Sequence, residues 1–467
     1  MLANVSFSHL WIWISFLCLS FYIFLVLDLS YLGKVSIMIF ILALILFIFS
    51  NLPAGLAGML CLIGAVLLGV PDSILFESLN QHIVWLMIGA FIISSVIEES
   101  GLLTRLVNWF SRKCHTEKRA SLFILATIQL MTFFIPSTSS RAAAMLPIYQ
   151  AIKTQFPKRA TMYGLMIPIL ILTMTNTTLI GAGSHLIGIG ILEGQTDKSI
   201  SYIDFVLWGL PFGLLISLIA AVILMYSPIK QQPMKEVSDK EPVDIEVDVE
   251  QTPLSSKERK AIILIGITIV LWVTESLHGL DIAFVTILMA FCMLIPQLGL
   301  ITWKKALSEV SWSLIFFVAS ATALGELLIK YGVVKYIQDQ ILSLLNGLPV
   351  MPAIVFVIIL SIISVGSHLL ITSHTTRAVV LVPTVLIFAE TFELNPMSVV
   401  FITLIGINYC LTLPVSSKAL LIFYELDDRP FNTSQLLKLN MWLLPIYVVF
   451  MVLMYLFYWQ FIGLKLK

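Results

Sequence analysis

Two arginines that directly follow runs of hydroxyl side chains are the residues best placed to bind an anion. Arg141 lies in PSTSSRAAAMLP (136–147), and Arg377 lies in TSHTTRAVVLVP (372–383). Both segments read Ser, any residue, two Ser or Thr, Arg, Ala, four mostly apolar residues and Pro. Both lie in apolar runs, where an arginine is costly unless it has a partner. Because guanidinium binds carboxylate or sulfate bidentately, the duplication predicts an anion site. The alternative is that each arginine reaches the membrane surface or pairs with an acid.

Further candidate ligands surround the two arginines. A helix broken inside a membrane exposes backbone groups that need polar partners, and half-helix N-termini favour anions. The expected substrate ligands are Ser137, Thr138, Ser139, Arg141, Ser373, His374, Thr375, Arg377, Ser184 and Ser416. A proton or charge role is expected for His185, His374 and Lys418, with ordinary polar packing or, for Lys418, capping of carbonyl groups as the alternative.

The composition is that of an integral membrane protein. Hydrophobic residues make up 59% of the 467 residues and charged residues only 12%. The apolar run 10–27 has no preceding basic region and no small-residue cleavage site, so residues 1–34 are predicted to hold an uncleaved first span. The five cysteines show no paired spacing and are interpreted as reduced core residues.

The chain contains an internal repeat. Residues 79–110 align with 310–341 without a gap, and 175–186 align with 407–418, which pairs Asn176 with Asn408 and Ser184 with Ser416. The arginine segments fall between these matches in the same order. We predict a first repeat at 35–227 with a re-entrant hairpin at 120–150, and a second at 259–467 with a hairpin at 352–390. Five crossing spans in each repeat would invert the second relative to the first.

The segment 228–258 separates the repeats and is predicted to be a polar cytoplasmic linker. If this linker and the connecting segments 100–120, 150–160, 296–306 and 425–440 lie in the cytoplasm, 18 of the 27 Lys and Arg residues are cytoplasmic. Six lie on the opposite side, and the other three are Arg141, Arg377 and Lys418. The positive-inside rule then puts the N-terminus inside and the C-terminus outside a cytoplasmic (inner or plasma) membrane.

Most enzyme classes lack support in the sequence. There is no HExxH, CxxC pair, P-loop or GxSxG motif, and no metal site or nucleic-acid partner is expected. A membrane-embedded enzyme that holds a lipid phosphate with Arg141 and Arg377 is the remote alternative, but it lacks a nucleophile–base pair. A cation/proton antiporter would need an acid in mid-membrane, and none is evident.

The two hairpins with Ser-Asn-Thr-like tips, each followed by a broken span, resemble the divalent anion/sodium symporter family. The broken spans are TLIGAGSH (178–185) and LPVSSKA (413–419). The resemblance covers about residues 35–462 and implies an all-α polytopic fold with two inverted repeats that moves as an elevator, and a homodimer. It implies secondary transport of dicarboxylates, citrate or sulfate, and it transfers the tip triplets to 137–139 and 373–375.

In the family, the tips and breaks also form sodium sites, which would fall on Ser137, Asn176, Gly181, Ser373, Asn408 and Pro414. This chain departs from the family at both tip asparagines, which are Thr138 and His374 here, and it lacks the Pro-Pro-Asn after each break. The arginine after each tip is similar to that of citrate/succinate and plastid dicarboxylate exchangers. Sodium is therefore a possible coupling ion only, with anion exchange and sodium-coupled symport both open. No other cofactor is expected.

Overall fold

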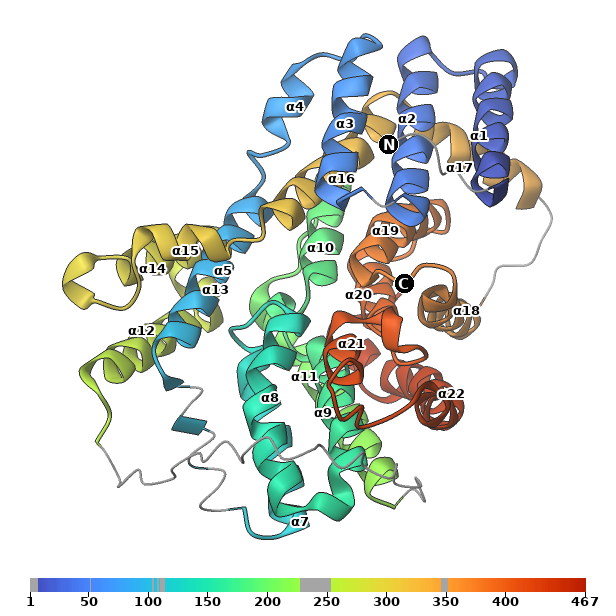
Figure 1. Ribbon diagram of the computed structural model, residues 1–467. Coiled ribbons are helices and arrows are strands. Elements are labelled where there is room, and N and C mark those ends of the chain that lie inside the picture. The colour runs from blue at the N-terminus through green and yellow to red at the C-terminus, as the bar shows by residue number, and fades with distance from the viewer. Residues whose placement is uncertain are drawn as a thin grey trace.

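The protein is built from helices and short 3-10 turns, with no β-strand in the part of the chain that the structure describes (Figure 1). This computed structural model describes residues 7–50, 52–102, 105–106, 109, 114–226, 253–345 and 352–467. The prediction of an all-α membrane protein is confirmed. Most of the predicted linker, up to residue 252, lies outside the described residues.

The first half of the chain begins with three apolar helices and a short helix. A long helix, a hairpin, a broken helix and a final long helix follow. In order these are α1 (Phe7–Val26), α2 (Tyr31–Phe49), α3 (Ala54–Leu67), α4 (Ser73–Glu77), α5 (His82–Glu99), the hairpin arms α7 (Glu117–Thr132) and α8 (Thr138–Gln155), the broken pair α9 (Ala160–Met174) and α10 (Gly183–Gln195), and α11 (Tyr202–Tyr226).

The second half presents corresponding elements in the same order. These are α12 (Ser256–Val273), α13 (Glu275–His278), α14 (Ile282–Met293), α15 (Trp303–Glu309), α16 (Trp312–Lys330), α17 (Val333–Leu345), the hairpin arms α18 (Ala353–Gly366) and α19 (His374–Thr391), the broken pair α20 (Pro396–Ile407) and α21 (Lys418–Tyr424), and α22 (Thr433–Phe457). In Figure 1, α7 and α8 occupy the lower part of the molecule and α19 the upper part.

Six helices within the described residues are long and apolar enough to cross a membrane, and five shorter apolar helices accompany them. The shorter ones include α18 and α20, because a hairpin arm or half of a broken helix does not need the roughly 20 residues of a full span. The protein is therefore a multi-pass membrane protein.

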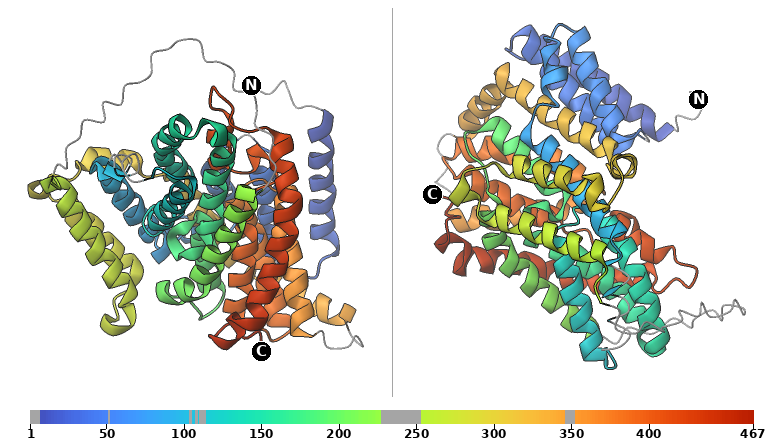
Figure 2. Two further views of the ribbon diagram at one scale, coloured as in Figure 1. Left: turned by 90° about the horizontal axis from the view of Figure 1, so that it is seen from below. Right: turned by 90° about the vertical axis from the view of Figure 1, so that its left-hand side faces the viewer.

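The two broken helices form the centre of the molecule. Every residue of α9 is buried, and α10 is buried from Gly183 to Leu192. Helices that are apolar all round in this way pack against protein on every side. The left view of Figure 2 shows α12 and α1 at opposite edges of the molecule, with the other helices between them.

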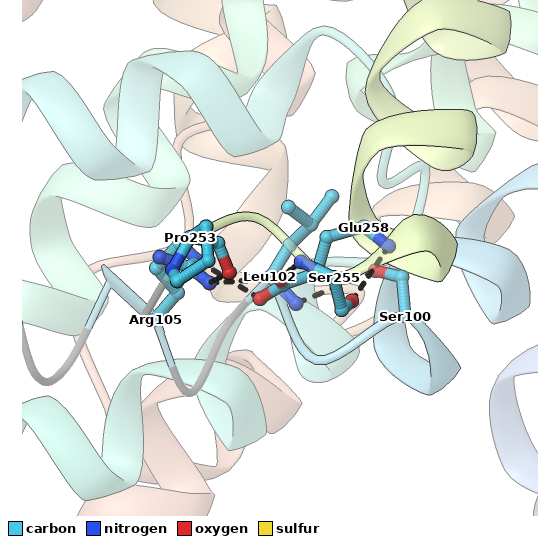
Figure 3. A network of polar contacts seen from close by, with 6 residues as sticks. All are labelled: Ser100, Leu102, Arg105, Pro253, Ser255 and Glu258. Carbon is cyan, nitrogen blue, oxygen red and sulfur yellow. Dashed lines mark hydrogen bonds and ion pairs between the residues drawn. The ribbon is translucent and has the colours of Figure 1, made fainter. Parts of the chain in front are cut away.

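The start of the second half is tied to the end of α5. Arg105 forms two hydrogen bonds with the carboxylate of Glu258, each 2.8 Å long, and Nη2 also donates to the carbonyl of Pro253 (Figure 3). Ser255 and Glu258 form a capping box that begins α12. The Arg105 guanidinium lowers the pKa of Glu258, in the polar first turn of α12, to about 2.

Candidate functional site

The two predicted tips have the same local structure. Ser137 caps α8 by accepting from the backbone N–H of Ser140 at 3.2 Å, and its Oγ lies 2.9 Å from that of Ser139. Ser373 caps α19 in the same way through Thr376, also at 3.2 Å. A serine in an extended conformation before a helix satisfies one of the free N–H groups of the first turn, which is why each hairpin turns at this residue. The hydroxyl groups of Ser139 and of its counterpart Thr375 bond to the capping serines and also line the cavity described below.

Arg141 lies behind the first tip and bridges it to the first break. Its Nη1 donates to Thr132 Oγ1 at 2.7 Å, and its Nη2 donates to Thr175 Oγ1 at 3.0 Å and to the carbonyl of Gly181 at 2.5 Å. The side chain is fully buried and its Nε has no partner within the described structure. The guanidinium therefore occupies a cage of hydroxyl and carbonyl oxygens.

Arg377 holds the equivalent place behind the second tip. Its Nη1 donates to the carbonyl of Tyr409 at 3.1 Å, and its Nη2 contacts Cys410 Sγ. It too is fully buried, with an unpartnered Nε. No ion pair to Arg141 or Arg377 is found among the described residues. Both guanidinium groups therefore lie one layer behind the tips, which differs from the expectation that they contact a substrate directly.

The breaks in the two central helices correspond in backbone conformation. Thr178 (φ −140°, ψ 152°) matches Leu413 (φ −126°, ψ 149°), and a 3-10 turn follows each of them. Ala182 and Ser417 are again extended, with φ of −147° and −150°, and directly precede α10 and α21.

This match makes Gly183 the counterpart of Lys418 and corrects the pairing of Ser184 with Ser416 that the sequence suggested. Gly183 lies seven residues after Asn176, whereas Lys418 lies ten residues after Asn408. The second break is therefore three residues longer, and an ungapped alignment could not register both its asparagine and its helix start.

The two breaks are joined by a buried amide pair. Asn408 Nδ2 donates to Asn176 Oδ1 at 2.9 Å, and Asn408 Oδ1 accepts from Ser184 Oγ at 2.7 Å. Asn176 Nδ2 donates to the hydroxyl of Tyr447 at 2.8 Å. Buried polar groups with complete hydrogen bonding fix a single arrangement. Asn176, Asn408 and Ser184 thus hold the breaks together and do not line the cavity described below.

His185 belongs to the same network. Its Nε2 faces Asn408 Nδ2, which can only donate, so Nε2 accepts. The ring proton is then on Nδ1, which donates to the carbonyl of Thr178 at 3.0 Å. This is the neutral imidazole, and it is fully buried against Phe205. The geometry gives His185 a structural place, in contrast with the proton or charge role expected from the sequence.

A cavity of about 620 Å³ lies between the tips and the first-half helices α3 and α5 together with α16. Its wall includes residues of both tips, the first residues of α10 and α21, and apolar side chains from the opposite side. These are Ser137, Thr138, Ser139, Ser373, His374, Thr375, Gly183, Ser416, Ser417, Lys418, Met87, Phe91, Leu314 and Phe317. Seven of the ten predicted substrate ligands line this cavity: the six tip residues at 137–139 and 373–375, and Ser416. Arg141, Arg377 and Ser184 do not line it.

The cavity wall is cationic. Lys418 is exposed within it, and none of the described residues that line it is an aspartate or glutamate. Arg377, Arg141 and Lys418 are among the groups that lie near the His374 ring, and all three are positive. Hydroxyl donors in a positive field suit a small anion of the size of a carboxylic acid.

The six residues predicted as cation ligands lie at the two tips and the two breaks. The Gly181 carbonyl accepts from Arg141, the two asparagines bond to each other, and Pro414 lies in the second 3-10 turn. Ser137 and Ser373 are helix caps at the cavity. At the first break, the Gly181 carbonyl oxygen therefore binds the Arg141 guanidinium.

Four residues that contact the arginines were missed in the sequence, namely Thr132, Thr175, Tyr409 and Cys410. Thr132 is a single hydroxyl in an apolar run, and Thr175 begins the polar run 175–178 that precedes the first break, so the position of both inside predicted spans was the available signal. Cys410 was interpreted as an ordinary core residue. No local pattern could reveal its contact with Arg377, because the two residues are 33 positions apart.

Comparison with known proteins identifies the family of the chain. A family model described as the sodium:sulfate symporter transmembrane region matches residues 4–465. The chain is 22% identical over 392 residues to a Cupriavidus necator protein named only as a membrane protein, covering 81% of this chain and 74% of the relative. It is 24% identical over 330 residues to the chloroplastic dicarboxylate transporter 1 of Spinacia oleracea, covering 66% of this chain.

It is also 23% identical over 283 residues to the L-tartrate/succinate antiporter of Shigella sonnei, covering 57% of this chain. The chain spans just over half the length of these last two relatives, 56% of each. Among solved structures, the YdaH transporter of Alcanivorax borkumensis has a TM-score of 0.48 at 13% identity, covering 82% of this chain and 86% of that one. Because the family model extends over almost the whole chain, the resemblance found in the sequence is confirmed: the protein belongs to the sodium:sulfate symporter family.

Proposed function

We propose that the protein is a secondary transporter that exchanges small di- or trivalent anions, such as dicarboxylates or citrate, across the membrane. One observation carries the proposal. Behind each hydroxyl tip of a single cavity lies a fully buried guanidinium, and neither has an acidic partner among the described residues. An unpaired buried charge costs roughly several kcal/mol, so a bound anion would supply the missing counter-charge.

In this proposal the tip residues contact the anion, and the two arginines behind them supply a positive electrostatic potential. Ser139 and Thr375 line the cavity from the first turns of α8 and α19, and each shares a hydrogen bond with the capping serine of its tip. The N-terminal ends of the two helices add partial positive charge at the same place. A dicarboxylate bridging the tips would place one carboxylate at each. The names of the spinach and Shigella relatives, a dicarboxylate transporter and a tartrate/succinate antiporter, support this substrate class.

The first break offers few free oxygen ligands for sodium. Thr132, Thr175 and Gly181 present three oxygens that would suit a small cation, and the Arg141 guanidinium already takes all three. A second cation beside it would be repelled. Sodium-coupled symport, to which the family's name points, is therefore the alternative, and exchange is the function favoured here.

Exchange also follows from the electrostatics of an empty carrier. A mobile unit made of the hairpins and broken helices, sliding as an elevator against α3, α5 and α16, would carry its cationic cavity through the membrane. Without an anion this crossing leaves the charges uncompensated in low dielectric. We propose this movement, a homodimeric assembly, and a cytoplasmic-membrane location with the N-terminus inside and the C-terminus outside.

The decisive experiment is counterflow into liposomes that contain the purified protein. Labelled succinate, citrate or sulfate is offered outside vesicles that hold the same unlabelled anion or none, in sodium or in choline buffer. We expect uptake only with internal anion, and equal rates in the two buffers. Uptake into empty vesicles that rises steeply with sodium would support symport instead.

A further inference from the structure

Lys418 is a positive charge that nothing in the cavity wall neutralises. It is the first residue of α21, it is exposed, and it lines the 620 Å³ cavity. Its ammonium group forms no hydrogen bond or ion pair with any residue that the structure describes. A lysine carries three donors, so a free ammonium at the wall of a binding cavity is open to a ligand.

A purely structural role does not fit this position. Lysine side chains stabilise helices by capping carbonyl groups at the C-terminus, whereas the first residue of a helix is surrounded by free N–H groups. The local cap is already made by Ser417, whose Oγ accepts from the Ala419 N–H at 3.2 Å. A cation at this end also opposes the dipole of the peptide groups. The position therefore costs stability and is explained by a ligand.

Lys418 also breaks the symmetry of the cavity. Its counterpart in the first break is Gly183, which lines the same cavity without any side chain. The arginines, by contrast, occur once behind each tip. Arg141 and Arg377 are thus equivalent residues of the two repeats, whereas Lys418 occurs in the second half alone.

The charge count distinguishes anions by valence. Arg141, Arg377 and Lys418 give three formal positive charges around the cavity, and no acid occurs among the lining residues that the structure describes. A dianion bridging the tips would leave one charge uncompensated, whereas a trianion balances all three. In a low-dielectric surrounding the balanced complex is favoured.

We propose that Lys418 is a specificity-determining residue that binds the third anionic group of a tricarboxylate, so that the carrier prefers trivalent over divalent anions. This inference rests on the proposed anion transport. It assigns the two tips to two carboxylates, and the ammonium group of Lys418 to the one that a dicarboxylate lacks.

The test compares two anions that differ by one carboxylate, glutarate and tricarballylate, as competitors of labelled-anion counterflow at pH 8. At this pH both are fully ionised and an ordinary imidazole is neutral, so His374 adds no charge. Wild type, Lys418→Met, Lys418→Gln and Lys418→Arg are compared, with Lys335→Met on α17 as a control that removes a lysine outside the cavity.

We expect wild type to prefer tricarballylate. Loss of the charge should weaken tricarballylate by about tenfold or more and glutarate much less, as expected for a lost charge-assisted contact. Lys418→Arg should retain the preference, and Lys335→Met should equal wild type. Equal weakening of both anions, or an unchanged ratio in both neutral variants, would refute the role of Lys418. Absence of any anion counterflow in the wild-type protein would instead refute the proposed function.

Discussion

Asn408 Nδ2 donates a hydrogen bond of 2.9 Å to Asn176 Oδ1, which joins the two helix breaks directly. The residues are 232 positions apart and each follows the first half of a broken helix. Because both breaks present their second half-helix to the same cavity, this contact sets the separation of the two half-sites. The amide pair therefore fixes the position of the two half-sites relative to each other, although neither asparagine lines the cavity.

Replacing Asn408 by alanine should destabilise the protein strongly. The change leaves Asn176 Oδ1, the Ser184 hydroxyl and His185 Nε2 without this partner in a buried place. An unsatisfied buried group costs about 1–3 kcal/mol, so the effects together should lower the thermal unfolding midpoint by many degrees. Asn80→Ala, at an exposed asparagine, is the matched control and should change little. An unaltered midpoint for Asn408→Ala would contradict the importance of the network.

Neutralising either tip arginine should weaken anion binding. Arg141→Gln and Arg377→Gln remove positive charge from directly behind the tips, and we expect affinity to fall by about tenfold or more. Arg119→Gln, which removes an exposed arginine from the first turn of α7, is the control.

Affinity should be measured by competition in counterflow and compared with the thermal midpoint of each variant. A lower midpoint with unchanged affinity in the folded protein would mean that the two arginines serve the structure alone.

Gly209 on α11 should not tolerate a side chain. A Cβ at this position would lie 2.2 Å from the backbone carbonyl of Asn176, which cannot move without displacing the first break. Gly209→Ala should therefore reduce both folded yield and counterflow. Gly266→Ala on α12 is the control, because a Cβ there has nothing within 4 Å. Helix propensity alone should make the control neutral or more stable by about 0.5–1 kcal/mol. Equal behaviour of the two variants would show that α11 can shift.

The attachment of α12 to Arg105 should depend on pH. The folded-state pKa of Glu258 is about 2, below its ordinary value of 4.5, because Arg105 stabilises the carboxylate. Its contribution is therefore complete above about pH 4.5 and is lost as the pH falls through about 2.

Hydrogen exchange at the start of α12, corrected for the intrinsic rate, should accelerate over this interval. In Glu258→Gln, hydrogen exchange at the start of α12 should be faster at every pH and should not accelerate further over this interval. A step of the same size in the variant would assign the effect to another group.

The tips were predictable from the sequence because their determinants are local. Ser137 and Ser373 cap helices through residues three positions away, and the arginines follow one turn later. The direction of the Arg141 side chain was not predictable, since its acceptor at Gly181 is 40 residues away. The neutral state of His185 likewise depends on Asn408, 223 residues distant. Such contacts are set by tertiary packing, which a single sequence does not reveal.

The three extra residues of the second break were hidden for a related reason. The asparagines align at one offset and the helix starts at another, so only backbone angles show that Lys418 corresponds to Gly183.

The contacts between the halves have a consequence for how the chain is made. Besides the asparagine pair, the Trp208 indole donates to the carbonyl of Ile462, that of Trp459 donates to the carbonyl of Trp208, and Arg105 pairs with Glu258. The covalent connection between Tyr226 and Pro253 is then one link among several. Two separately translated polypeptides, cut within 228–252, should find each other in the membrane and restore exchange, so the gene can be divided there into two cistrons that each encode one half.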